Sequence, residues 1–123
     1  MKNETQIENL LDLIIVNQGG TFNSDKSLFV APHGYQVAMK GYEKPIEPTV
    51  QALNNYFNSL KELEVAKEDK IFFGFWLDSQ DGVLYADLSV YIKDVNRALE
   101  FGLQEDQKAI WDWSNFAEIR LAQ

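Results

Sequence analysis

The sequence predicts a single α+β domain over residues 1–123, with one mixed, largely antiparallel sheet and three helices. Three observations support this prediction. The 123 residues are 46% hydrophobic, which is sufficient for one packed core. Helical and strand-like patterns follow one another in the order helix, two or three short strands, helix, hairpin, helix, hairpin. The chain also contains no repeat, low-complexity tract or linker long enough to separate two domains.

The first helix is expected over residues 4–17. Apolar side chains recur there at the spacing of one helical stripe: Ile7, Leu10, Leu11 and Ile14. Gly19 and Gly20 predict the end of this helix. Three more apolar side chains widen the apolar surface beyond one stripe: Leu13, Ile15 and Val16. This width predicts a helix that is buried on more than one side.

The next region changes to short β-type runs at residues 21–23, 27–30 and 35–40, separated by turn-forming residues. These runs predict two or three antiparallel strands. Pro45 and Pro48 bracket a linker, and Pro48 suits the first residue of a second helix over about residues 48–65.

The segment from Ile71 to Ile92 contains two β-rich runs around Asp81-Gly82, a strong signal for a two-residue hairpin turn. With that turn, Phe75 lies opposite Leu88 and Trp76 lies opposite Asp87. One face then holds only apolar side chains: Ile71, Phe73, Phe75, Leu77, Ala86, Leu88, Val90 and Ile92. A slip by one residue would destroy this separation of faces.

The third helix is expected over residues 94–104, with Asp94 as its N-cap. Its inner stripe is predicted to hold four small or apolar residues: Val95, Ala98, Leu99 and Gly102. The helix connects the strand that ends at Ile92 to a strand that begins near Gln107. A second hairpin follows, in which a turn at Ser114-Asn115 pairs Ile110 with Ile119.

Four segments carry a resemblance to known proteins: Gly74-Phe75-Trp76-Leu77-Asp78, Gly82-Val83-Leu84-Tyr85-Ala86-Asp87-Leu88-Ser89, Arg97-Ala98-Leu99 and Gln107-Lys108-Ala109-Ile110-Trp111-Asp112. Together they resemble a family of small bacterial proteins of unknown function, often found among phage and mobile-element genes. The resemblance covers the chain from Gly74 onward well and the earlier residues only loosely. It implies one α+β domain and an accessory role, and it transfers no catalytic residue.

Composition excludes several classes of chemistry. The chain has no cysteine and one histidine, His33, so disulfides, thiol nucleophiles, cysteine metal sites and histidine-pair metal sites are excluded. No catalytic residue, metal or cofactor is predicted. The N-terminal residues do not form a secretory signal, and no apolar run is long enough to span a membrane, so a cytoplasmic location is expected.

The net charge of −8 disfavours direct binding to nucleic acid phosphates or anionic lipid, but it permits a basic protein partner. Both hairpins also place large rings on the face that is not the obvious core: Phe72, Trp76, Tyr85, Tyr91, Trp111, Trp113 and Phe116. Two interpretations are open. Helices or a curled sheet cover these rings as a second core layer, or some of the rings are exposed for a partner.

The second interpretation gives a set of partner-binding candidates: Trp76, Asp78, Tyr85, Asp87, Glu105, Asp106 and Trp113. The function it predicts is a non-catalytic acidic interaction module, an accessory or inhibitor protein of a mobile element that engages a basic, nucleic-acid-binding protein. One alternative is a divalent-cation-dependent enzyme, which requires at least two of Asp78, Asp87 and Asp112 to converge in a pocket. The other is a homodimer formed through a sheet edge or the aromatic face.

Overall fold

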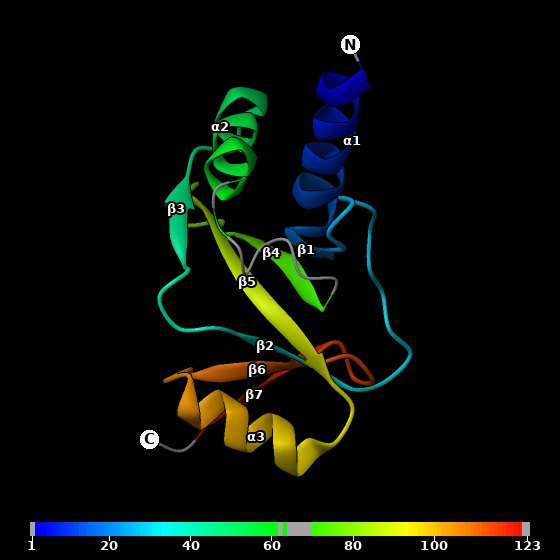
Figure 1. The fold of residues 1–123 in the computed structure, drawn as a ribbon, viewed down its shortest axis with the longest axis vertical. Helices are drawn as coiled ribbons and strands as arrows, with labels where there is room; N and C mark the ends of the chain where they lie inside the picture. Colours follow the sequence, from blue (N-terminus) through cyan, green and yellow to red (C-terminus); the bar gives the residue numbers. More distant parts are fainter. Residues whose placement is uncertain (1, 62, 64–69, 122–123) are drawn as a thin grey trace.

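Three helices and seven strands follow the predicted order in the computed structural model, which describes residues 2–61, 63 and 70–121 (Figure 1). The helices are α1 (Lys2–Asn17), α2 (Val50–Leu60) and α3 (Val95–Gln104). The strands are β1 (Gly19–Phe22), β2 (Tyr35–Ala38), β3 (Lys44–Ile46), β4 (Ile71–Leu77), β5 (Leu84–Ile92), β6 (Ala109–Asp112) and β7 (Ala117–Arg120).

The strands form one sheet in the order β1-β4-β5-β2-β6-β7, with β3 paired to β5 beside this path. The predicted α+β class is confirmed, and every pair among the described strands is antiparallel. The expected connection from β5 through α3 to β6 is present. It creates no parallel pair, because β2 lies between these two strands and runs opposite to both.

The main core lies between α1, α2 and one face of the sheet. Along α1, the predicted stripe is buried and includes Leu10 and Ile14. The prediction that α1 is buried on more than one side is wrong, because Leu13, Ile15 and Val16 are exposed. Only one side of α1 contacts other elements, so its wider apolar surface faces solvent.

Helix α3 packs on the same face of the sheet as α1 and α2, at the opposite end of the molecule (Figure 1). Ala98 of α3 lies in a second core cluster with Val37 of β2 and Ile110 of β6. Val37 is paired with Val90, which contacts both core clusters. Val95 was expected in this core, but it is exposed.

The β4–β5 hairpin separates its faces as predicted, but the predicted register is wrong by two residues. Phe75 pairs with Ala86 instead of Leu88, and Trp76 pairs with Tyr85 instead of Asp87. The turn is a four-residue loop, in which the N–H of Asp78 donates to the carbonyl of Val83. A shift by two residues keeps each side chain on its face, so the apolar pattern alone could not exclude it.

The predicted strand over residues 27–30 is also wrong, since this segment forms only an isolated bridge between Leu28 and Phe22. It belongs to the connection between β1 and β2, which crosses the face of the sheet that carries no helix. Phe29 packs there against Phe72, Tyr91 and Trp113, with ring centroids 4.5, 5.5 and 5.6 Å away. A loop, and not a helix, therefore covers part of the aromatic side chains on the face of the sheet opposite the helices, which we call the second aromatic face.

The remaining predictions concern element ends. Pro48 was expected as the first residue of α2, but it lies before the helix, because Thr49 is the cap. The helix ends at Leu60 instead of about residue 65; positions 62, 64 and 65 lie outside the described residues. The predicted linker contains β3, and Asp94 caps α3 as predicted. Ile110 pairs with Ile119 as predicted, across a four-residue turn at 113–116 instead of two residues. Within the described ranges, no helix has the length and hydropathy of a membrane span.

Candidate protein-binding surface

Trp76 lies near the end of β4, between β1 and β5, yet it is 56% exposed. Its cross-strand neighbour on β5 is Tyr85, whose ring stacks on the indole at 6.1 Å with an interplanar angle of 28°. Its neighbour on β1 is Gly19, which has no side chain to cover the ring. A large aromatic surface is therefore open to solvent on the face opposite the helices.

Carboxylates surround the Tyr85 hydroxyl. This hydroxyl donates a hydrogen bond to Asp81 Oδ2 at 3.0 Å. That hydrogen bond is the largest cause of a raised Tyr85 pKa, and the negative charges of Asp81, Asp78 and Glu43 add to it. The positions of two of these carboxylates are fixed by the hairpin loop, because Asp78 Oδ1 accepts from the Gln80 N–H and Asp81 Oδ1 accepts from the Val83 N–H.

Asp87 completes this group from the middle of β5. It lies opposite Gly74, where an added Cβ would overlap the Asp87 Oδ1 atom. Burial, followed by the negative charge of Glu43, raises the pKa of Asp87 to about 6. We name the whole group the Trp76 surface; it comprises Glu43, Trp76, Asp78, Asp81, Tyr85 and Asp87.

Trp113 was expected on an exposed surface, and this expectation is wrong. The side chain is only 5% exposed because Phe29 covers it. Its Nε1–H donates to Gln36 Oε1 at 3.1 Å, and Gln36 Nε2 donates to Ser89 Oγ at 3.0 Å. Trp113 therefore belongs to a second core layer with satisfied polar atoms.

Glu105 and Asp106 lie beside Lys40, at the end of α3. Glu105 Oε1 accepts from the backbone N–H of Lys40 at 3.0 Å, and Asp106 forms an exposed ion pair with the Lys40 ammonium at 3.7 Å. An exposed pair of this kind contributes at most about 1 kcal/mol to stability. The side chains of these two predicted residues contact Lys40, and neither residue belongs to the Trp76 surface.

Of the three carboxylates proposed for a metal-dependent enzyme, Asp78 and Asp87 lie on the Trp76 surface, and Asp112 lies apart from them in the β6–β7 turn. Asp78 accepts a hydrogen bond within the β4–β5 loop, whereas buried Asp112 accepts from Ser114 N and Asn115 Nδ2 in the β6–β7 turn. Among the residues that the structure describes, no group of three or more His, Asp or Glu side chains could hold a metal ion. Asp112 is thus separate from Asp78 and Asp87, and among the described residues no third ligand joins these two to form a metal site.

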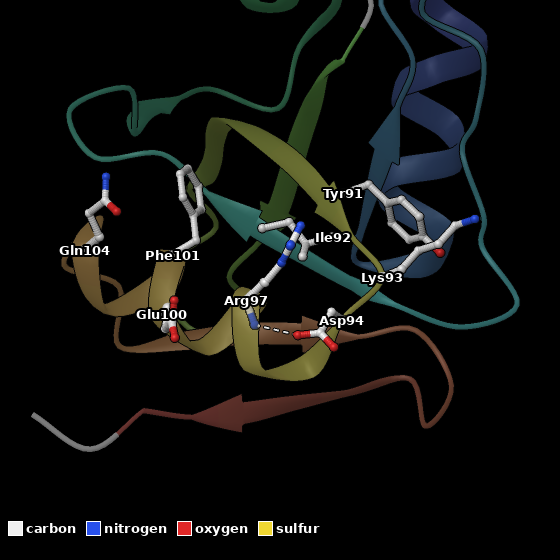
Figure 2. A pocket seen from close by; sticks show the side chains of 8 residues that line it. All are labelled: Tyr91, Ile92, Lys93, Asp94, Arg97, Glu100, Phe101 and Gln104. Atoms are coloured by element: carbon white, nitrogen blue, oxygen red, sulfur yellow. Dashed lines mark hydrogen bonds between the residues drawn. The ribbon is translucent and has the colours of Figure 1, made fainter.

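A groove of about 750 Å³ lies between the end of β5 and α3 (Figure 2). Its walls carry two cations, Lys93 and Arg97, and two carboxylates, Asp94 and Glu100. Asp94 is engaged as the cap of α3, where Oδ2 accepts from the Arg97 N–H at 2.9 Å. The groove includes no member of the Trp76 surface, and its charges balance.

Sequence reasoning missed two members of the Trp76 surface, Glu43 and Asp81. Asp81 was assigned to the turn, where its side chain was not considered as part of a site. Glu43 precedes β3, a strand hidden by Pro45, and recognition of that strand beside β5 would have placed Glu43 near Asp87 and Tyr85. Comparison of the chain with protein-family models, with curated proteins and with solved structures gives no match.

Proposed function

We propose that this protein is a non-catalytic interaction module whose Trp76 surface binds a basic region of a protein partner. The observation that carries the proposal is the exposed Trp76 ring, which stacks on Tyr85, whose hydroxyl is surrounded by carboxylates. Tryptophan and tyrosine are enriched at the centres of protein interfaces. The resemblance of residues 74–112 adds an accessory or inhibitory role in a mobile element to this proposal.

The two parts of the surface have different roles in binding. The carboxylates of Glu43, Asp78, Asp81 and Asp87 attract a cationic partner during its approach, so association should slow as salt concentration rises. The Trp76 and Tyr85 rings exclude water after contact and lengthen the lifetime of the complex. Arginine suits such a surface best, because its guanidinium can pair with carboxylates and stack on an aromatic ring.

The first test is affinity capture with three baits: wild type, Trp76→Ala and the control Val16→Ala. Val16 is an exposed apolar residue on α1, outside the Trp76 surface. We expect wild type and Val16→Ala to retain a basic protein that Trp76→Ala loses. Equal capture by all three baits, or a Trp76-dependent partner that is acidic, would refute the proposal.

The second test measures binding rates with the purified partner. Trp76→Ala should raise the dissociation rate, whereas the pair Glu43→Gln and Asp87→Asn should mainly lower the association rate at low salt. The matched control is the pair Glu8→Gln and Asp12→Asn, which removes the same charge from exposed positions on α1. An association rate reduced equally by both pairs would show only an effect of net charge, and it would contradict the assigned surface.

A further inference from the structure

The two edges of the sheet differ. At the β1 edge, a bridge joins Phe22 to Leu28, and the Phe29 N–H donates to the Thr21 carbonyl at 2.8 Å. At the other edge, β7 pairs with β6 on one side only, and no other described strand adjoins it. An unpaired edge strand is a template for pairing with another chain.

The hydrogen-bonding pattern shows which β7 groups face outward. The Leu121 N–H donates to the Lys108 carbonyl, so this directly opposed pair is a hydrogen-bonded one. Such pairs alternate in antiparallel ladders, so Ile119 also directs its backbone groups toward β6. The N–H and C=O groups of Glu118 and Arg120 therefore point away from the sheet, at the open edge.

The side chains of the same two residues are self-complementary. Glu118 and Arg120 are exposed and lie two positions apart, on one face of β7. If two copies pair β7 antiparallel with Ile119 at the centre, Glu118 of each copy lies opposite Arg120 of the other. The outward backbone groups of these residues then form the hydrogen-bonded pairs. A register shift by two residues would instead oppose Glu118 to Glu118 or Arg120 to Arg120.

We propose that the protein forms a two-fold symmetric homodimer through antiparallel pairing of β7 with β7 of a second copy. The Glu118 and Arg120 pattern selects a second copy as the partner, because a two-fold axis at Ile119 satisfies both charges at once. Ile119 packs on the face that carries α3, so the Ile119 side chains of the two copies would lie side by side between the two α3 helices.

Apolar surface on α3 adjoins this edge. Figure 2 shows Arg97, Phe101 and Gln104 on the side of α3 that faces β5. Helical spacing places Val95, Leu99 and Leu103 on the other side, toward the β7 edge. Val95 is 38% exposed and Leu103 is 50% exposed, so the dimer has apolar surface to bury beyond the four-residue strand itself.

Analytical ultracentrifugation of charge-reversed variants tests both the dimer and its register. Glu118→Arg alone and Arg120→Glu alone each place like charges opposite each other, and each should raise the dimer dissociation constant by about tenfold or more. An equimolar mixture of the two variants should form a heterodimer as tight as the wild-type dimer, because each Arg then faces a Glu. A single chain that carries both reversals should also dimerise.

Three results with the wild type and the two reversed variants would overturn the proposal. The first is a wild-type protein that stays monomeric up to roughly 1 mM. The second is a single reversal that dimerises as tightly as wild type, and the third is a mixture of the two variants that stays monomeric. Trp76→Ala serves as the control: it should leave the dimer unchanged, and its loss of dimerisation would move self-association to the Trp76 surface. Circular dichroism of each variant confirms that the exposed substitutions leave the fold intact.

Discussion

At the scale of single residues, two glycines determine how the Trp76 surface is exposed. Gly19 leaves the Trp76 ring uncovered on the β1 side. Gly74 provides space for the Asp87 carboxylate over β4, in the position that a Cβ would take. The exposed ring and the partly buried acid thus both depend on the absence of a side chain on a neighbouring strand.

Gly74→Ala should lower the free energy of unfolding by about 1 to 3 kcal/mol, because the new methyl group overlaps the Asp87 carboxylate. In an Asp87→Ala background the same substitution should cost less than about 0.5 kcal/mol, since the overlapping group is gone. Urea unfolding of the four proteins of this double-mutant cycle measures the difference. Equal costs in both backgrounds would show that Asp87 is not the group in conflict.

Asp87 should make stability depend on pH. Burial and then the charge of Glu43 raise its pKa from 3.8 to about 6, so the folded protein binds this proton more tightly than the unfolded chain. The free energy of unfolding should therefore rise by up to about 2 to 3 kcal/mol as the pH falls from about 7 toward 4. This contribution is absent above the folded pKa.

Asp87→Asn removes the titrating group, so this variant should be more stable than wild type at about pH 7.5 and should lose most of the increase below pH 6. Urea unfolding at several pH values measures both effects. Asp12→Asn, at an exposed position on α1, is the control and should keep the wild-type dependence. An Asp87→Asn variant with an unchanged pH profile would contradict the raised pKa.

At the scale of elements, the connection between β1 and β2 performs a role that a helix often has in an α+β fold. Phe29 fills the space above Phe72, Tyr91 and Trp113, and the Tyr91 hydroxyl donates to the His33 carbonyl. This loop covers the centre of the second aromatic face, while Trp76 stays uncovered. The rings beneath Phe29 thus form a covered second core layer, whereas the Trp76 ring on the same face is exposed.

Phe29→Ala should therefore destabilise the fold by about 2 to 4 kcal/mol, as expected when a packed aromatic ring is removed. Trp113 would lose its cover, so its fluorescence should shift to longer wavelength in the folded variant. Leu28→Ala is the matched control, because the neighbouring Leu28 side chain is exposed and should change stability little. Equal stability of the two variants would show that the loop does not form a core layer.

At the scale of the whole molecule, three helices lie on one face of an antiparallel sheet and a loop covers part of the other face (Figure 1). Two features for recognition remain on this framework: the Trp76 surface and the open β7 edge. The net charge of −8 favours cationic partners for the first. The second needs a segment with complementary charges, which a second copy of the chain supplies.

Folding should not require a divalent cation. The chain has no cysteine, and the described residues contain no cluster of three or more side chains able to hold a metal ion. Addition of EDTA should therefore change the melting temperature by no more than about 2 °C, the shift expected for a fraction of a kcal/mol in a domain of this size. A larger fall, reversed by added Mg²⁺ or Ca²⁺, would show a structural metal site.

The sequence by itself determined those features that depend on local periodicity and capping. The buried stripe of α1, the Asp94 cap, the two faces of the β4–β5 hairpin and the pairing of Ile110 with Ile119 are examples. Each of these follows from side chains that are neighbours along one element or across one short turn. The order of the helices and of the strands other than β3 follows for the same reason.

Only the tertiary structure decided the features that depend on residues far apart in the chain. The β4–β5 register was undetermined, because a shift by two residues leaves every side chain on its face. Trp76 and Trp113 are both aromatic residues on the second face of the sheet, yet Gly19 leaves one exposed and Phe29 buries the other. β3 is a strand because it pairs with β5, about 40 residues later. Burial depends on such distant neighbours, and no local pattern encodes them.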